Sequence, residues 1–217
     1  MNIFDEDLSA YLEETCDAES ALLQGIKRET FLSEVRPNML SGHYQGRLLS
    51  MISKMVAPNK ILELGTFTGY STLCLAEGLK KEGVIHTIDI NEELEDKVKD
   101  YFASSPFNNQ IKYHIGDADK VIDRLDGHFD LVFIDADKKN NLSYFLKVID
   151  RVNPGGIILI DNVLWKGKIF EEKPDKRTRD VRELNERIAA DARIEKLILP
   201  VRDGLYVLRK QDDFTKI

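Results

Sequence analysis

The stretch ILELGTFTGYS, residues 61–71, decides the fold. It opens with an apolar run that carries Glu63 near its end, turns at Gly65 and Gly69, and then takes on a helical pattern. A strand that leads through a glycine turn into a helix usually faces a ligand. The nearest familiar pattern is the dinucleotide fingerprint G-x-G-x-x-G, but Phe67 stands where the second glycine lets the backbone approach a pyrophosphate. The stretch therefore predicts a nucleotide-like ligand other than a dinucleotide.

Size and charge narrow the class of protein. The chain has 217 residues, of which 42% are hydrophobic and 32% are charged. That length suits one sizeable core better than two, so we expect a single domain over residues 1–217. The formal net charge of -7 argues against broad electrostatic attraction to nucleic acid or to an anionic membrane, although a local basic patch is compatible with it.

The N-terminus and the cysteines indicate a compartment. Residues 1–20 are acidic where a secretory signal is basic and then apolar, and no apolar run reaches the ~20 residues of a membrane helix. We therefore expect a cytoplasmic protein with no membrane segment. Cys16 and Cys74 lie far apart and lack a C-x-x-C or histidine spacing, so we interpret both as ordinary thiols.

The pattern of apolar residues changes after Pro58. Before it, helical periodicity predominates, with a break at residues 36–38; after it, short β-rich runs alternate with helical ones. The expected N-terminal helices are residues 8–16, 18–35 and 45–56; the expected strands are 60–65, 84–90, 111–117, 129–136 and 155–163; the helices between them are 71–83, 91–105, 118–127 and 142–152. Five buried strands separated by helices predict a parallel, doubly wound α/β sheet.

The C-terminal part adds an antiparallel edge. After a charged stretch, a helix is expected over residues 179–192, and two strands within residues 195–210 are joined by a tight turn at residues 202–204. These strands bring the sheet to seven. Because no linker or repeat interrupts the chain, we interpret residues 1–56 as a helical cap on a core of residues 57–217.

Acidic residues follow the strands of the predicted parallel sheet. In open α/β sheets, ligands bind beyond the carboxyl ends of the strands, so these residues are candidates for a site. They are Glu63, Asp89, Asp117, Asp135, Asp137 and Asp161, with Asn162 beside the last. Helix caps and turns are the alternative explanation for any one of them. Asp89 has a more specific interpretation, because an acid at the end of the second strand, after such a glycine turn, commonly accepts hydrogen bonds from ribose hydroxyls.

Asp135, Asp161 and Asn162 predict a cation site. They supply two carboxylates and one amide oxygen from neighbouring strand ends, a set that suits a hard divalent cation which keeps several waters. No His or Cys accompanies them, so zinc is disfavoured. Mg²⁺ is the expected ion, with Mn²⁺ and Ca²⁺ as alternatives. The spacing of the histidines suggests no shared site, and none is assigned: His43, His86, His114 and His128.

The motifs along the chain resemble those of the cation-dependent, S-adenosylmethionine-dependent O-methyltransferases of the caffeoyl-CoA and catechol type, a family with many bacterial members. They are ELGTFTGYS, the acid in TIDIN, GDA, FIDADK and DNVLW, followed by RELN and DGL, over about residues 36–209. The resemblance implies a class I methyltransferase fold, Rossmann-like and doubly wound, with N-terminal helices. The implied cofactor, S-adenosylmethionine, has no pyrophosphate and so tolerates Phe67 in the turn.

Carried over by position, the resemblance implies a set of cofactor residues. They are Met39, Ser41, Glu63, Gly65, Thr66, Ser71, Asp89, Asp117, Ala118 and Asp135. Glu63 and Gly65 line the methionine end in this interpretation. Asp89 holds the ribose, while Asp117 and Ala118 border the adenine.

A second set of residues serves the acceptor. It comprises the metal ligands Asp135, Asp161 and Asn162, the base Lys138, which acts with Asp135 in catalysis, and Asp137 and Trp165, which flank the acceptor. The implied reaction transfers the sulfonium methyl group to one hydroxyl of a catechol-like small molecule whose two oxygens contact the ion. The alternatives are a solvated surface lysine at Lys138 and a packing role for Trp165.

Several departures from the family bear on the acceptor. Asn140 and Asn141 stand where an aromatic residue is usual, and residues 168–180 differ from the plant pattern that grips coenzyme A, so a CoA ester is disfavoured. Proteins of similar appearance modify a hydroxylated uridine, which makes a tRNA 5-hydroxyuridine the alternative acceptor. That alternative needs a basic surface, whereas residues 166–187 interleave Lys and Arg with Glu and Asp. A non-catalytic protein with the same fold is a further alternative, disfavoured by the complete set of metal ligands.

The N-terminal helices predict self-association. Their apolar residues exceed what a small appendage needs to cover: Leu8, Leu12, Leu22, Leu23, Ile26, Phe31 and Leu32. We therefore expect a homodimer, which is also usual in the resembling family.

Overall fold

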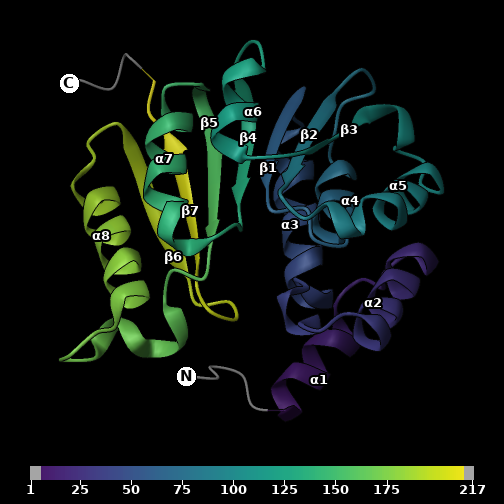
Figure 1. The fold of residues 1–217 in the computed structure, drawn as a ribbon, viewed down its shortest axis with the longest axis horizontal. Helices are drawn as coiled ribbons and strands as arrows, with labels where there is room; N and C mark the ends of the chain where they lie inside the picture. The colour runs from purple at the N-terminus through teal and green to yellow at the C-terminus, as the bar shows by residue number, and fades with distance from the viewer. Residues whose placement is uncertain (1–5, 213–217) are drawn as a thin grey trace. The chain divides into compact units, whose positions relative to one another are not determined.

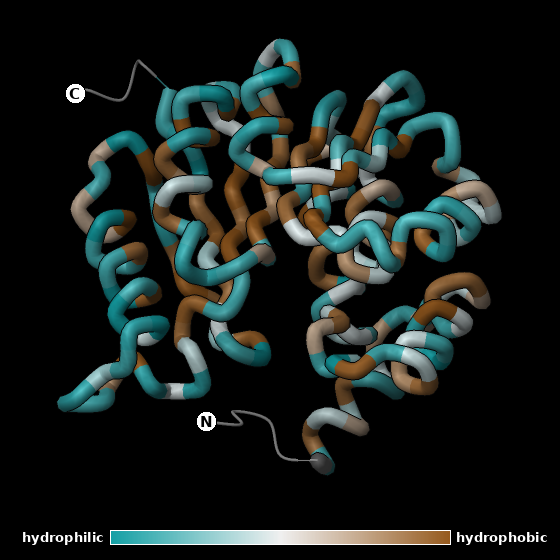
Figure 2. The backbone as a smooth tube through the Cα atoms, viewed as in Figure 1, coloured by the Kyte–Doolittle hydropathy of each residue, from teal (hydrophilic) through white to brown (hydrophobic). Residues whose placement is uncertain are grey.

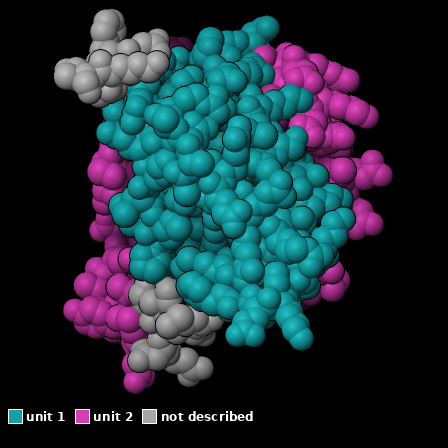
Figure 3. Space-filling model, turned by 90° about the vertical axis from the view of Figure 1, so that its left-hand side faces the viewer, with its two compact units in different colours: residues 1–3, 126–217 teal, residues 4–125 magenta. Residues whose placement is uncertain are grey.

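The computed structural model describes residues 6–212, which form two compact units. Of the described residues, unit 2 takes in those up to Leu125, and unit 1 takes in those from Asp126 onward (Figure 3). The first five residues of the expected cap lie outside the described residues, and they are also part of the stretch that we interpret as lacking a secretory signal. The expected domain end at residue 217 lies outside them too. The division into a cap of residues 1–56 and a core of residues 57–217 stays a prediction.

Unit 2 contains three parallel strands and the N-terminal helices. The strands are β1 (Lys60–Leu64), β2 (Val84–Asp89) and β3 (Ile111–Ile115), and β2 pairs with both of the others. The helices are α1 (Glu6–Thr15), α2 (Ala21–Ser33), α3 (Gly42–Val56), α4 (Tyr70–Ala76), α5 (Glu95–Ala103) and α6 (Ala118–Arg124), with short 3₁₀ helices η1 (Pro37–Met39), η2 (Glu92–Leu94) and η3 (Asn108–Gln110) (Figure 1). The expected alternation of strand and helix is confirmed here.

Unit 1 contains the other four strands. They are β4 (Phe129–Ile134), β5 (Val152–Asp161), β6 (Ile194–Leu199) and β7 (Leu205–Lys210), accompanied by α7 (Asn141–Ile149), α8 (Lys176–Ala190), η4 (Lys138–Asn140) and η5 (Trp165–Phe170). β4 and β5 are parallel, and β7 is antiparallel to both β5 and β6. The seven-stranded order is β3-β2-β1-β4-β5-β7-β6. The predicted mostly parallel sheet with an antiparallel edge is therefore confirmed.

The core lies on the parallel strands. β1 and β4 are almost completely buried, because helices of a doubly wound fold cover both faces of such strands and leave no solvent-facing positions. Their sequences, KILEL and FDLVFI, accordingly run apolar rather than alternating. Figure 2 shows these strands among the most hydrophobic segments of the chain.

Some helix ends differ from the expected ones. The helix expected over residues 71–83 ends at Ala76. Two residues later, a side chain at Gly78 would meet the backbone of Ser53 in α3 at 2.2 Å, so the chain passes too close to α3 for any other residue. The helix expected from residue 179 begins at Lys176 instead, because Asp175 caps it by accepting a hydrogen bond of 2.7 Å from the backbone nitrogen of Thr178.

Two smaller expectations can be compared with the structure. Both cysteines are free thiols, and burial raises the pKa of Cys74 to about 12, so it is an unreactive packing residue. Within residues 6–212, none of the helices has the length and apolar character needed to cross a membrane.

Candidate active site

The turn after β1 has the backbone of a ligand-facing loop. Gly65 and Gly69 have φ angles of 103° and 78°, and Phe67 between them has a φ of 47°, in the left-handed region that non-glycine residues rarely adopt. A hydrogen bond of 2.8 Å from the nitrogen of Gly69 to the carbonyl of Thr66 closes the turn. A side chain at Gly69 would approach the ring of Phe102 to 2.6 Å. The glycine pattern in the sequence thus reflects both conformation and close packing.

Asp89, at the end of β2, lies against this turn. Its Oδ2 accepts a hydrogen bond of 2.7 Å from the backbone nitrogen of Phe67, and its Oδ1 accepts one of 2.9 Å from the nitrogen of Asn91. The turn and the acid, which the sequence places 20 or so residues apart, are therefore in direct contact. Each carboxylate oxygen can accept a second hydrogen bond, so the half-buried group keeps acceptor capacity for a ligand.

Glu63 and Thr66 lie behind the turn. The Glu63 side chain is fully buried, and its Oε2 accepts a hydrogen bond of 2.7 Å from Thr87 and another from Thr72. The hydroxyl of Thr66 lies 2.6 Å from that of Thr87 and belongs to the same network. The structure thus places both side chains in the internal support of the turn, and their contact with a cofactor stays a prediction.

The other predicted cofactor residues of unit 2 lie at the ends of its helices. Ser71 is buried in the first turn of α4, Ser41 is buried at the start of α3, and Met39 is 54% exposed at the end of η1. Asp117 is exposed and caps α6, of which Ala118 is the first residue. Asp117 therefore caps a helix, as the alternative explanation predicted. A helix-capping Asp117 can still lie beside the adenine of a cofactor.

Contacts from the N-terminal helices reach the glycine turn. The hydroxyl of Thr30, in α2, donates a hydrogen bond of 3.1 Å to that of Thr68, and both side chains are fully buried. Tyr70, just after the turn, donates a hydrogen bond to Glu19. Helix α2 and the segment before it therefore bond to residues of the turn and of the start of α4.

In unit 1, Asp135 and Lys138 form a pair directly after β4. The Nζ of Lys138 donates a hydrogen bond of 2.8 Å to Oδ1 of Asp135, and the side chains are only 14% and 20% exposed. Asp137 lies between them in sequence, is exposed, and pairs with Lys139 at 3.1 Å. The lysine that the sequence singled out is thus held at the predicted carboxylate, while its neighbour Lys139 faces solvent.

Asp161 and Asn162 follow β5 in the same unit. Asp161 is 4% exposed, and its Oδ1 accepts a hydrogen bond of 2.7 Å from the backbone nitrogen of Asn162. Asn162 has a φ of 64°, which is tolerable for asparagine. Trp165 also has a positive φ, of 48°, and its indole nitrogen is buried without a hydrogen-bond partner among the described residues.

The donor set fits a hard divalent cation in its chemistry. No group of three or more His, Cys, Asp or Glu side chains suited to a metal occurs between residues 6 and 212. The predicted set differs from such a group because one of its three donors is the Asn162 amide. Two carboxylates with an amide oxygen leave coordination positions for water or a substrate, as Mg²⁺ prefers.

The structure brings together two histidines that sequence reasoning left unassigned. Nδ1 of His86 lies 3.0 Å from Nε2 of His114, and the rings stack with their centroids 5.3 Å apart. Burial, together with the nearby Lys60, His114 and Lys112, lowers the pKa of His86 to about 4; burial also lowers the pKa of His114. The two lie on paired strands, β2 and β3, so only the strand register could have revealed the contact.

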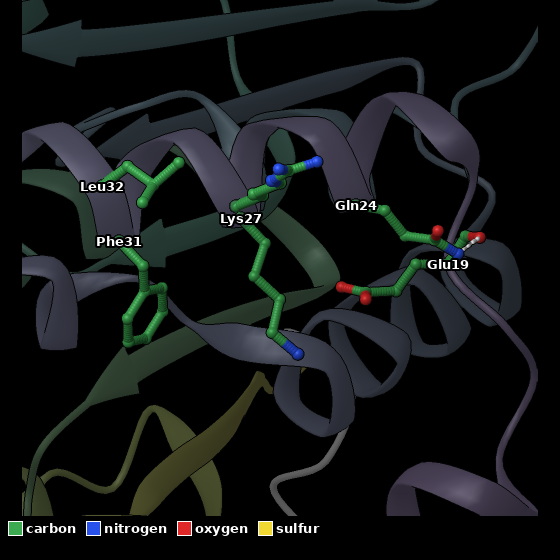
Figure 4. Close-up of a pocket in the computed structure, with 6 residues that line it drawn as sticks. Glu19, Gln24, Lys27, Phe31 and Leu32 are labelled. Carbon is green, nitrogen blue, oxygen red and sulfur yellow. Dashed lines mark hydrogen bonds between the residues drawn. The ribbon is translucent and has the colours of Figure 1, made fainter.

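A hollow of about 470 Å³ lies along α2, apart from the predicted site residues. Figure 4 shows five of its six lining residues labelled, all from α2 or the segment before it. They are Glu19, Gln24, Lys27, Arg28, Phe31 and Leu32. None of them belongs to the predicted cofactor or acceptor sets.

Comparisons with known proteins agree with the motifs. Residues 13–211 match the model of a family described as O-methyltransferase. The chain is 37% identical over 180 residues to caffeoyl-CoA O-methyltransferase 2 of Petunia hybrida, which covers 76% of this chain and 74% of that protein. An SAH-bound methyltransferase structure from Podospora anserina aligns with a TM-score of 0.88 and 26% identity, over 96% of this chain and 97% of the other. The O-methyltransferase of Bacillus cereus, solved in complex with SAH, aligns with a TM-score of 0.87 and 26% identity, over 94% and 97%.

Proposed function

Because the chain belongs to the O-methyltransferase family and is an S-adenosylmethionine-dependent enzyme of that family, we propose that it methylates one of two vicinal hydroxyls on a catechol-like small molecule with the help of a divalent cation. The observation that carries this proposal is the contact between Lys138 and Asp135 at the end of β4. It joins a potential proton acceptor to a potential metal ligand, which are the two groups that activation of a hydroxyl requires.

The cofactor part of the proposal concerns unit 2. S-adenosylmethionine carries a ribose and no pyrophosphate, and Asp89 accepts the hydrogen bonds of the ribose hydroxyls in this proposal. The support for this role is that Asp89 contacts the turn through Phe67 and keeps acceptor capacity. SAH, which is bound in two of the similar structures, is the product that remains after the methyl group has left.

The acceptor part of the proposal concerns unit 1. Asp135, Asp161 and Asn162 would hold the cation, Mg²⁺ by expectation with Mn²⁺ and Ca²⁺ as alternatives. A divalent ion in such a site lowers the pKa of a coordinated hydroxyl. A neutral Nζ of Lys138 would take the proton, or its ammonium form would stabilise the oxyanion left by deprotonation. That oxygen would attack the sulfonium methyl group in line, and SAH would leave as the S–CH3 bond breaks. Trp165 offers a flat wall to the aromatic ring, and Asp137 flanks it.

Contacts in unit 1 argue against RNA as the acceptor. Nη1 of Arg179 donates a hydrogen bond of 2.7 Å to the carbonyl of Pro174, Arg182 bonds two local carbonyls, and Lys168 lies 3.8 Å from Asp175. Cations that are tied to their own surroundings offer less to a phosphate backbone. A tRNA acceptor is therefore kept only as one outcome of the test. The cytoplasmic location and the homodimer remain parts of the proposal.

Turnover with and without metal tests the proposal. Purified protein is incubated with S-adenosylmethionine and a panel of catechols, or with bulk tRNA from a methylation-deficient strain, in Mg²⁺ or in EDTA, while SAH release is followed. We expect turnover on a catechol that EDTA abolishes, and loss of that turnover in Asp135→Ala and Asp161→Ala. Asp150→Ala, at an exposed surface ion pair with Arg193, is the control. Turnover that survives EDTA or both substitutions would remove the metal mechanism, and turnover on RNA alone would replace the acceptor.

A further inference from the structure

We propose that Asn185 and Asp203 are positioning residues that fix the backbone after β5, and with it the Asp161–Asn162 pair. This inference rests on the proposed function of that pair as metal ligands. Neither residue is proposed to touch the metal, the cofactor or the acceptor. Both act through the segment of residues 162–171, which we call the post-β5 segment.

The post-β5 segment has a backbone that does not hold its shape by itself. Asn162, Trp165 and Lys166 all have φ angles between 48° and 64°, although none of them is glycine. Residues in the left-handed region persist only where the surrounding structure determines them, and they concentrate at functional sites. Some other part of the chain must therefore supply the contacts that keep this segment in place.

The turn between β6 and β7 supplies the first set of contacts. The backbone nitrogen of Leu164 donates a hydrogen bond of 2.8 Å to the carbonyl of Asp203, and the nitrogen of Val163 donates one of 3.1 Å to the carbonyl of Gly204. The carboxylate of Asp203 also accepts a hydrogen bond from the backbone nitrogen of Lys166. A side chain at Gly204 would lie 2.4 Å from Cγ of Leu164, so glycine at this position leaves room for the Leu164 side chain.

Helix α8 supplies the second set of contacts. Nδ2 of Asn185 donates a hydrogen bond of 2.8 Å to the carbonyl of Val163. One helical turn earlier, Nε of Arg182 donates one of 2.9 Å to the carbonyl of Ile169, and its guanidinium also bonds the carbonyl of Glu171. The side chains that reach the segment thus belong to the RELN motif, which the cofactor and acceptor assignments leave unused.

These contacts set the orientation of the predicted ligands. Val163 directly follows Asn162. Its nitrogen bonds to Gly204 and its carbonyl accepts a hydrogen bond from Asn185. The nitrogen of Asn162 in turn bonds Oδ1 of Asp161. A shift of Val163 therefore changes both the backbone of Asn162 and the carboxylate of Asp161. Groups that orient metal ligands in this way typically contribute about 10- to 100-fold to metal affinity.

Metal binding without turnover tests the inference. The dissociation constants of Mg²⁺ and Mn²⁺ are measured by isothermal titration calorimetry on the full chain, with thermal unfolding as a check of the fold. The variants are Asn185→Ala, Asp203→Ala, Asp203→Asn, Asp161→Ala and the control Asn153→Ala. Asn153 is a matched control because it is also a half-buried asparagine of unit 1, and its Nδ2 donates a hydrogen bond of 2.7 Å to Asp130, outside the post-β5 segment.

We expect Asn185→Ala and Asp203→Ala to bind the ion about 10- to 100-fold more weakly than the wild type. Asn153→Ala is expected to bind within about twofold of it, because ligand orientation is untouched. Asp203→Asn should recover most of the affinity, since an amide oxygen can also accept from Lys166. A positioning role predicts in addition that kcat falls more than KM for the acceptor rises.

The outcomes separate the inference from the function on which it rests. If the wild type binds the ion, Asp161→Ala does not, and both alanine variants bind like Asn153→Ala, the inference is overturned and the metal site stands. If the wild type binds no ion, the metal site and the inference fail together. If Asn185→Ala does not fold, the pair Asp203→Ala and Asp203→Asn decides the question.

Discussion

The backbone nitrogen of Phe67 lies 2.7 Å from Oδ2 of Asp89, so the glycine turn after β1 and the acid that ends β2 hold each other in place. The contact uses the backbone amide of Phe67, so it does not depend on the identity of the side chain at this position. Asp89 therefore has two roles: it accepts a hydrogen bond from the turn, and in the proposed function it also accepts hydrogen bonds from the ribose of the cofactor.

Replacement of Asp89 by alanine is expected to weaken cofactor binding at least about 10-fold, because a charge-assisted hydrogen bond contributes about 1.5–3 kcal/mol. Titration calorimetry with SAH measures the effect. Asp150→Ala removes a carboxylate from an exposed surface ion pair and serves as the control. Binding of SAH by Asp89→Ala within about twofold of wild type would contradict the ribose role.

Lys138 and Lys139 offer a matched pair of substitutions. Lys138→Met keeps the length of the side chain but removes its amine, and kcat is expected to fall by about 10²- to 10⁴-fold, the usual share of a general acid or base. Lys139→Met alters the neighbouring surface lysine, which is 61% exposed in its side chain, and should leave kcat unchanged. Steady-state rates, with SAH affinity measured alongside, distinguish the two; equal effects at both positions would exclude a base at Lys138.

The hydrogen bonds to the buried carboxylate of Glu63 should contribute to the free energy of unfolding. Thr87→Val keeps the shape of the side chain and removes the hydroxyl that donates to Glu63 at 2.7 Å. The free energy of unfolding is expected to fall by about 1–3 kcal/mol, since a buried acceptor loses a donor. Urea denaturation provides the measurement. Ser104→Ala, which loses an exposed hydrogen bond within α5 and its cap, should cost under about 0.5 kcal/mol; similar losses in the two variants would argue against the network.

The paired histidines predict a pH dependence of stability. The folded protein keeps His86 neutral down to about pH 4, whereas the unfolded chain takes up a proton near its ordinary pKa of 6.5. The free energy of unfolding should therefore be highest above pH 6.5 and fall as the pH drops toward 4. One proton gives a slope of at most about 1.4 kcal/mol per pH unit, and solvent reduces it for a half-buried pair.

Urea denaturation between pH 4 and pH 8 measures that slope. His86→Gln is expected to flatten it, while His128→Gln, at an exposed histidine, should leave it as in the wild type. An unchanged slope in His86→Gln would show that other groups cause the dependence.

The sequence predicted the parts of the fold that depend on local pattern. Buried parallel strands read as apolar runs, and the left-handed positions of Gly65 and Gly69 require glycine, so β1 and its turn could be located from the residues alone. The need for glycine at position 78 could not, because it depends on the approach of Gly78 to Ser53, which lies on another helix. Helix propensity carries no information about such a contact.

The candidate site divides in the same way. Asp89 and Lys138 could be singled out because each follows a strand at a recognisable position in a motif. The contact between His86 and His114 depends on the register of two strands, and the grip of Asn185 on Val163 depends on how α8 packs. Both contacts join residues that are far apart in the chain, so they can be predicted only once the fold is known.

The reversal of β7 has a consequence for the order in which the protein matures. Since β7 runs antiparallel to β5, its first residue, Leu205, pairs with Asp161, the last residue of β5. The proposed ligand pair thus acquires this neighbour only from a strand that is synthesised well after β5. A nascent chain released before Leu205 lacks that neighbour, so premature termination should yield protein that does not bind the ion. Titration of Mn²⁺ into a chain stopped at Val201 would contradict this if the ion still bound with wild-type affinity.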